Sequence, residues 1–171
     1  MPTARRCIYL CADDLDPSIQ SFRELYDPLG RLVEPHITVV FPFESNVSDD
    51  ELRAHVREQV IAESGFAASL EQQPMRHDGY IYFPILDGAQ QIRTIHDRLY
   101  TGVLQPLLLE IPYVPHVTVA RTTDAEEKQL LRESSSLEFD NKFRISKLKI
   151  ERVLHDDRGQ LIYQILFRSG I

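Results

Sequence analysis

The pattern of apolar and polar residues predicts short strands separated by amphipathic helices along the whole chain. Apolar runs of strand length, rich in β-branched and aromatic residues, occupy residues 6–12, 33–43, 66–74, 79–86, 113–121, 143–154 and 160–167. Between them, apolar residues recur at helical spacing in residues 17–27, 48–63, 89–105 and 122–134. This mixture of strand and helix periods is typical of an α+β protein.

Two turn-rich stretches predict β-hairpins. Residues 76–79 separate the strands at 66–74 and 79–86, and residues 155–159, which end in Arg-Gly, separate the last two strands. No linker, low-complexity tract or block of like charges divides the chain. We therefore expect a single domain that spans residues 1–171.

A five-residue phrase occurs twice, as Pro-His-Ile-Thr-Val at residues 35–39 and as Pro-His-Val-Thr-Val at residues 115–119. Successive side chains of a strand point to opposite faces, so the His and Thr of each copy share one face and the aliphatic residues the other. The polar residues concerned are His36, Thr38, His116 and Thr118. The duplication predicts two lobes related by a pseudo-two-fold axis, with antiparallel sheets flanking a central cleft in which the motifs face each other.

Two facing imidazoles with neighbouring hydroxyls suit substitution at phosphorus. That reaction needs a base at the entering oxygen, an acid at the leaving oxygen and hydrogen-bond donors at the non-bridging oxygens. Histidine serves either proton-transfer role because its ordinary pKa is close to neutrality. A zinc site is the alternative for paired histidines, but neither motif has Cys, Asp or Glu at ligand spacing beside it. We therefore expect a mechanism without a metal or other cofactor.

Composition and charge restrict the partners. Charged residues make up 26% of the 171 residues, and the formal net charge is −7, which argues against an extended nucleic-acid footprint. No apolar run is long enough for a membrane span, and no secretory cleavage site follows the N-terminus, so we expect a cytoplasmic protein. Cys7 and Cys11, two strand positions on one face, are interpreted as reduced thiols. A monomer is the simplest expectation.

The paired motifs resemble those of the 2H phosphoesterase superfamily, which is named for two H-x-[TS] motifs. Residues 36–39 and 116–119 match these HxTx motifs, and residues 119–121, Val-Ala-Arg, are similar to a frequent continuation of the second. The resemblance covers nearly the whole chain, and the most similar branch is that of the bacterial 2′-5′ RNA ligases and RNA cyclic phosphodiesterases. It implies a bilobal α+β fold and activity on 2′,3′-cyclic phosphates, 2′-5′ linkages in RNA or related small phosphodiesters.

The resemblance also implies roles for the motif residues. His36 and His116 would be the general acid and base, in an order that the sequence leaves open, and Thr38 and Thr118 would donate hydrogen bonds to the phosphoryl oxygens. Arg121 is a candidate substrate-binding residue, although strand alternation points it away from the face of His116 unless the strand has already ended. Aromatic residues that are candidates for stacking on a nucleobase are Tyr80, Tyr82 and Tyr113.

Three functions are consistent with these features. The first is hydrolysis of a 2′,3′-cyclic phosphate at an RNA end or on a nucleotide, or of a related small phosphodiester. The second is 2′-5′ joining of RNA ends through the same site, against which the net negative charge weighs. The third is a module that binds a nucleotide or RNA end without turnover, which would not require a matched acid and base.

Overall fold

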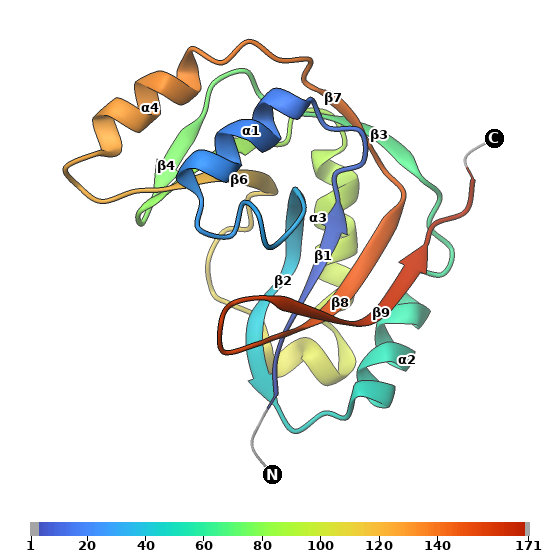
Figure 1. Ribbon diagram of the computed structural model, residues 1–171. Coiled ribbons are helices and arrows are strands. Elements are labelled where there is room, and N and C mark those ends of the chain that lie inside the picture. Colours follow the sequence, from blue (N-terminus) through green and yellow to red (C-terminus); the bar gives the residue numbers. More distant parts are fainter. Residues whose placement is uncertain (1–3, 170–171) are drawn as a thin grey trace.

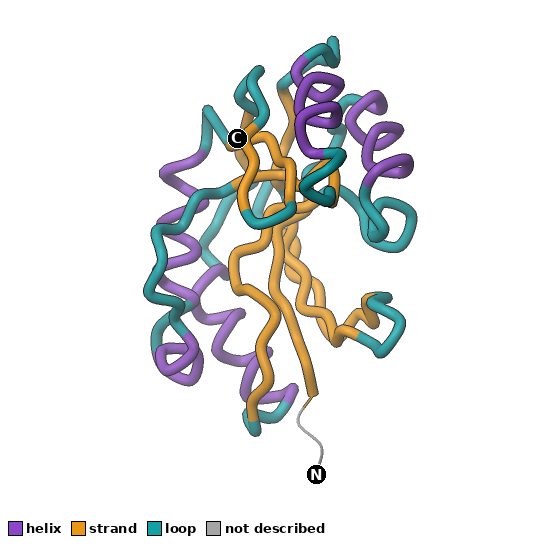
Figure 2. The backbone as a smooth tube through the Cα atoms, turned by 90° about the vertical axis from the view of Figure 1, so that its left-hand side faces the viewer, coloured by secondary structure: helices purple, strands orange, loops and turns teal. Residues whose placement is uncertain are grey.

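The computed structural model describes residues 4–169, and within them the strands form antiparallel sheets with helices on both sides (Figures 1 and 2). In chain order, the elements are β1 (Ala4–Cys11), α1 (Pro17–Tyr26), β2 (His36–Ser45), α2 (Asp49–Val60), β3 (Phe66–Ser69), β4 (Met75–His77), β5 (Tyr80–Pro84), α3 (Ala89–Leu99), the 3₁₀ helix η1 (Gly102–Leu107), β6 (His116–Arg121), α4 (Glu127–Ser135), β7 (Lys142–Ile145), β8 (Lys147–Val153) and β9 (Gly159–Leu166). The strand orders are β2-β1-β8-β9, β4-β5-β6 and β3-β7. The predicted α+β class with antiparallel sheets is confirmed.

The duplicated unit is a strand, a helix and a motif strand. β1, α1 and β2 form the first unit, and β5, α3 and β6 form the second, with the two strands of each unit paired antiparallel. Each helix packs against the motif strand of the other unit, α1 against β6 and α3 against β2 (Figure 1). Because each unit packs its helix against the motif strand of the other unit, the two motif strands are fixed relative to each other.

The apolar faces of the motif strands form part of the core. Ile37, Val39, Val117 and Val119 are all fully buried, as the alternation predicted. One residue of α1 is not buried as the helical spacing predicts. Leu25 is one of the apolar residues at helical spacing in residues 17–27, but 71% of it is exposed.

Several predicted pairings and boundaries are wrong for physical reasons. The turn at residues 76–79 joins β4 to β5, with Asp78 and Gly79 both at positive φ, but β3 pairs with β7 instead. The predicted strand at 143–154 is two strands in different sheets, separated at Ser146. The helix predicted at 89–105 ends at Leu99, after which Gly102, at positive φ, opens the 3₁₀ helix. The choice of partner strand by β3 and β7 depends on pairing between distant segments, which leaves no local signal in the sequence.

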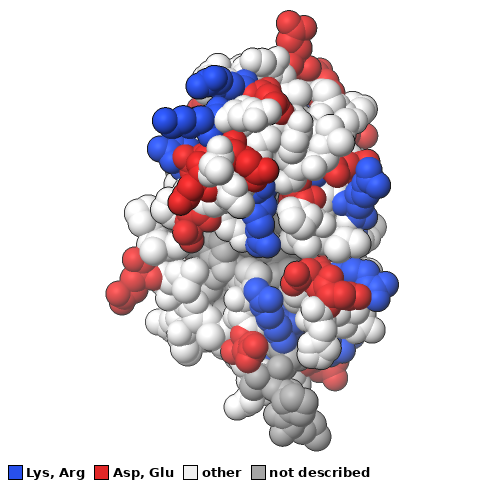
Figure 3. All heavy atoms as spheres, turned by 60° about the vertical axis from the view of Figure 1, so that its left-hand side comes forward, with Lys and Arg blue, Asp and Glu red and all other residues white. Residues whose placement is uncertain are grey.

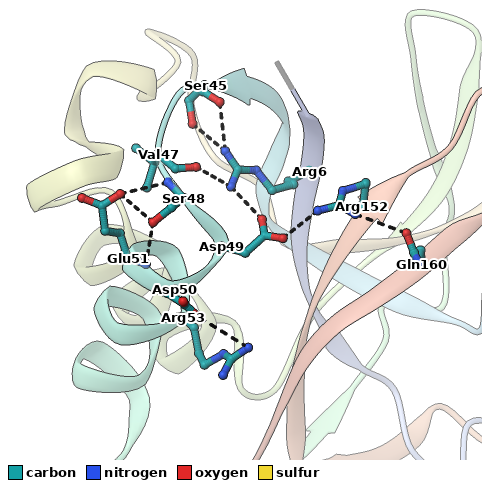
Figure 4. A network of polar contacts seen from close by, with 10 residues as sticks. All are labelled: Arg6, Ser45, Val47, Ser48, Asp49, Asp50, Glu51, Arg53, Arg152 and Gln160. Carbon is teal, nitrogen blue, oxygen red and sulfur yellow. Dashed lines mark hydrogen bonds and ion pairs between the residues drawn. The ribbon is translucent and has the colours of Figure 1, made fainter. Parts of the chain in front are cut away.

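A buried arginine joins the first strand to the turn between β2 and α2 (Figure 4). Arg6 is 1% exposed and donates hydrogen bonds to the carbonyl oxygens of Val47 and Ser45, at 2.7 and 3.1 Å, and to Asp49 at 3.0 Å. Asp49 also pairs with Arg152 of β8 at 2.6 Å. Three segments distant in sequence are therefore held by one network.

We expect Arg6→Met to lower the free energy of unfolding by about 2 kcal/mol, since it leaves two partly buried carbonyl oxygens and one oxygen of the partly exposed Asp49 carboxylate without this partner. Urea denaturation followed by circular dichroism measures this difference. The matched control is Arg5→Met, at an exposed position of the same strand, with an expected change within about 0.5 kcal/mol. Equal losses in the two variants would contradict the structural role of Arg6.

Candidate active site

The structure brings the four motif residues together at facing sheet edges. β2 is an edge strand of its sheet, β6 is an edge strand of another, and the two strands contact each other. His36 and His116 are close enough that a charge on His116 contributes to lowering the pKa of His36. The side chains of both His and both Thr are half-buried, so they remain open to a small ligand.

The two imidazoles are oriented in the same way. His36 Nδ1 lies 2.8 Å from the carbonyl oxygen of Glu34, and His116 Nδ1 lies 2.7 Å from that of Val114. A carbonyl oxygen only accepts, so Nδ1 carries the proton in each ring and donates it. Nε2 of each neutral ring is then the basic nitrogen, and it becomes a donor when the ring is protonated.

A tyrosine supports each imidazole from the neighbouring strand. The ring of Tyr9 lies 4.8 Å from that of His36, and the ring of Tyr82 lies 4.3 Å from that of His116. Tyr9 is paired in the sheet with Thr38, and Tyr82 is paired with Thr118. The sequence did not single out Tyr9, because only strand pairing shows that it is equivalent to Tyr82.

Burial lowers the pKa of both histidines. For His36, loss of solvation is the largest cause and lowers the pKa to about 4, while the Glu34 carbonyl opposes the shift and the nearby Arg23 adds to it. For His116 the direction and the main cause are the same. With its pKa lowered to about 4, His36 is neutral near neutral pH.

A β-bulge turns Arg121 towards the site, which corrects the orientation given by simple alternation. In the β5–β6 register, Ile81 pairs with Ala120 and Tyr82 with Thr118, so Val119 is an extra residue. Arg121 pairs with Tyr80, two positions from Tyr82, and therefore lies on the same face as Thr118. Its Nη2 donates to the Tyr80 hydroxyl at 2.6 Å.

The three tyrosines proposed for stacking lie in different environments. Tyr82 is 9% exposed and lies against His116, whereas Tyr80 is 38% exposed and holds Arg121. Tyr113 stacks on His96, at 3.8 Å between ring centroids and 9° between planes. The hydroxyl of Tyr113 also donates a hydrogen bond to the Thr38 carbonyl oxygen. Because His96 covers its ring, we interpret Tyr113 as a structural residue rather than a stacking surface for a nucleobase.

Each motif Thr has its backbone carbonyl held by a donor from the other half of the molecule. The Tyr113 hydroxyl, from the segment before β6, donates to the Thr38 carbonyl at 2.7 Å. Arg23 of α1, 1% exposed, donates from Nε to the Thr118 carbonyl at 3.1 Å. We name these two contacts the cross-lobe brace. Each contact joins a residue of one half to the motif strand of the other half, so the brace fixes one motif relative to the other.

We expect Tyr113→Phe to lower kcat for any reaction of the cleft by about tenfold with a smaller change in KM, since one lost hydrogen bond misplaces Thr38 at the reacting group. The phenylalanine ring retains the stack on His96. The matched control is Tyr100→Phe, which removes a buried hydroxyl that accepts from the Phe41 N–H at 3.2 Å. Similar kcat losses in both variants at similar melting temperatures would contradict a specific role of Tyr113.

Other chemistry was sought across the described chain. Residues 4–169 contain no group of three or more His, Cys, Asp or Glu side chains placed to hold a metal ion. Cys7 and Cys11 are both free thiols, as the sequence analysis expected, and burial raises the pKa of each to about 12. No helix among the described residues is long and apolar enough to cross a membrane.

The face in Figure 3 is hollowed across its middle, with Lys and Arg side chains above and below.

Comparison with known proteins gives consistent matches. The family model of the 2′-5′ RNA ligase superfamily matches residues 12–157. A Bacillus licheniformis protein whose name gives phosphoesterase as a proposed activity is 30% identical over 162 residues, which cover 85% of this chain and 80% of that protein. A similarly named Bacillus pumilus protein is 28% identical with the same coverage.

Solved structures share the fold. The E. coli protein LigT in its apo form has a TM-score of 0.65 at 13% identity, covering 99% of this chain and 100% of LigT. LigT in complex with 3′-AMP has a TM-score of 0.61, also at 13% identity, covering 98% of this chain and 99% of LigT. At this identity the likeness concerns the fold alone.

Proposed function

The chain belongs to the 2′-5′ RNA ligase superfamily, and we propose that it hydrolyses 2′,3′-cyclic phosphates of RNA ends or nucleotides, or a closely related small phosphodiester. The observation that carries the proposal is the matched pair of imidazoles. His36 and His116 each hold Nδ1 on a carbonyl oxygen, which leaves Nε2 of each ring as the nitrogen that exchanges a proton. In support, E. coli LigT, which shares this fold, has been solved in complex with 3′-AMP and with phosphate.

In the proposed reaction, Nε2 of one His takes a proton from water as the water oxygen bonds to phosphorus. The bond from phosphorus to one ribose oxygen breaks, and that oxygen receives the proton from Nε2 of the other His. Since its lowered pKa of about 4 keeps His36 neutral near neutral pH, we assign it the role of base and give His116 the role of acid. Both proton transfers are carried by imidazoles, so no step requires a metal ion.

Thr38 and Thr118 would donate hydrogen bonds to the non-bridging oxygens, on which negative charge accumulates in the transition state. Arg121, on the face of Thr118, adds a positive charge near the same oxygens. Among the described residues no carboxylate lies within 4.0 Å of its guanidinium group, so this charge is available to a ligand.

The test is incubation of EDTA-treated protein with a nucleoside 2′,3′-cyclic phosphate, with the product identified by phosphorus NMR. We expect conversion to a single phosphomonoester, which His116→Ala should slow by about 10³-fold. Absence of product with folded protein would reject the assignment for this substrate and favour another phosphodiester or a binding module. The module would show saturable nucleotide binding without product.

The second candidate is 2′-5′ joining of RNA ends, the activity for which the superfamily is named. By microscopic reversibility the same acid and base could serve, with a ribose hydroxyl as the attacking group in place of water. Supplying an RNA with a 5′-hydroxyl end to the same assay distinguishes the two. A joined product would favour ligation, and the phosphomonoester alone would favour hydrolysis.

A further inference from the structure

The side chain of Glu34 is anchored on the face of the four-stranded sheet that carries His36. Its carboxylate accepts a hydrogen bond from the Cys11 thiol of β1 at 3.4 Å and forms an ion pair with Lys149 of β8. Cys11 is paired in the sheet with His36, and Lys149 is paired with Tyr9, so both partners lie on this face. The side chains of Lys149 and Glu34 are 19% and 38% exposed, so water screens this pair less than a pair on the open surface.

The three anchoring groups are in the protonation states that these contacts require. Partial burial raises the pKa of Glu34, but its partners, with the Lys149 hydrogen bond first among them, lower this pKa overall. Loss of solvation, followed by the charge of Glu34, raises the pKa of Cys11 to about 12. Near neutral pH the carboxylate therefore accepts, while the thiol and the ammonium group donate.

The backbone of the same residue orients the imidazole of His36. The Glu34 carbonyl oxygen lies 2.8 Å from His36 Nδ1 and so selects the tautomer that has its proton on Nδ1. A residue before proline is restricted to extended backbone, so Pro35 limits the directions open to this carbonyl. The Pro35 carbonyl oxygen in turn accepts from the Ala12 N–H at 3.1 Å. With the backbone restricted in this way, a side-chain anchor on Glu34 fixes where its carbonyl oxygen lies.

The second motif has the same backbone arrangement with a different side chain. The Val114 carbonyl oxygen lies 2.7 Å from His116 Nδ1. The following Pro115 carbonyl oxygen accepts from the Ile85 N–H at 2.9 Å, as that of the first motif does from β1. Val114 is 40% exposed, and a valine side chain can neither donate nor accept a hydrogen bond. The duplication is therefore symmetric in the backbone around each imidazole and asymmetric in the side chain that precedes it.

We propose that Glu34 is a positioning residue for His36, and that its anchor on Lys149 and Cys11 maintains the tautomer of the histidine that acts as the base. This rests on the proposed function, which assigns the base to His36. A neutral histidine can accept a proton at Nε2 only if its own proton is on Nδ1. A histidine that acts as the acid is protonated on both nitrogens and has no tautomer to select before it donates. An ionic anchor beside His36, where the second motif has valine, therefore suits the division of roles between base and acid.

Two-bond ¹H–¹⁵N NMR spectra of the imidazole rings near pH 7 test this proposal without a substrate. In the wild-type protein we expect His36 to be in the Nδ1–H form. Glu34→Ala and Lys149→Met should each raise the ratio of its Nε2–H form to its Nδ1–H form about fivefold, because the hydrogen bond that selects the tautomer is weakened. The tautomer of His116, whose carbonyl partner is Val114, should be unchanged in both variants and is the internal control.

The rate of cyclic phosphate hydrolysis gives a second measurement. Glu34→Ala and Lys149→Met should each lower kcat about tenfold with KM within about twofold, since a misoriented base affects the transition state more than binding. The double variant should be no slower than either single variant, because both changes remove the same anchor. Lys149→Arg keeps a charged donor and should restore both the rate and the tautomer.

The matched control is Lys147→Met, which removes the same charge two positions earlier on the same strand face. Lys147 pairs with Asp13 at 2.8 Å, so this variant should leave the tautomer of His36 and the rate unchanged. Glu34→Gln keeps an acceptor for Lys149 and should give a smaller change than Glu34→Ala, which guards against misfolding of the latter.

An unchanged His36 tautomer in Glu34→Ala and Lys149→Met, or an equal change in Lys147→Met, would overturn the proposal. If the wild-type protein does not hydrolyse the cyclic phosphate, the proposed function fails, while the spectra still decide whether Glu34 positions His36.

Discussion

His116→Ala is expected to lower kcat for hydrolysis of a nucleoside 2′,3′-cyclic phosphate by about 10³-fold, because it removes the proton donor to the leaving oxygen. His36→Ala should have a comparable effect through loss of the base. The double variant should be little worse than either single variant, because the two groups act in one transition state. Initial rates under single-turnover conditions separate this chemical step from product release.

The controls for this prediction distinguish loss of chemistry from loss of fold. His155→Ala, at an exposed position of the β8–β9 turn, should retain the wild-type rate. Both catalytic variants should retain the wild-type circular dichroism spectrum and cooperative thermal unfolding, since neither His is fully buried. Full activity in either folded variant would remove that residue from the mechanism.

The local sequence pattern was sufficient to predict the composition of the candidate site. His36 and Thr38 alternate with two fully buried aliphatic residues, a period that belongs to a strand with one core face. Because the phrase is repeated, the same argument applies to the second copy. The hairpin before Gly159 was equally local, and β9 does follow β8 across that turn.

The features that sequence reasoning missed depend on pairing between distant segments. The orientation of Arg121 was wrong because a bulge at Val119 is defined only against its partner strand, and Tyr9 was missed because its relation to Thr38 is a sheet register. The cross-lobe brace needs α1 to pack on β6, a contact between residues about a hundred positions apart in the chain. Short-range spacing contains no information on such contacts.

The brace residue Arg23 also affects the pKa of His36. Arg23 lies at the point where α1 meets both motif segments, donating to the Thr118 carbonyl and, at 3.2 Å, to the Val33 carbonyl. The same positive charge contributes to lowering the pKa of His36. Loss of solvation is the main cause of the low pKa of His36, and the residue that fixes the two strands adds to it.

The pH dependence of kcat/KM is expected to be bell-shaped, with its maximum in the acid range. Below a pKa of about 4, His36 is protonated and cannot accept the proton of water. Above the pKa of His116, which burial holds below its ordinary value of 6.5, the donor to the leaving oxygen is lost. The active form, with His36 neutral and His116 protonated, is therefore lost on both sides of an optimum that lies below the ordinary histidine pKa.

Initial rates from about pH 3 to pH 9 at constant ionic strength measure both limbs. The limbs of the kcat profile should lie at higher pH than those of kcat/KM, because a bound phosphate anion favours the protonated form of each imidazole. A kcat/KM maximum above pH 7 would contradict the assigned protonation states. Since burial lowers both values, a variant that opens the cleft to water near His36 should move the acid limb upward, towards the ordinary histidine pKa.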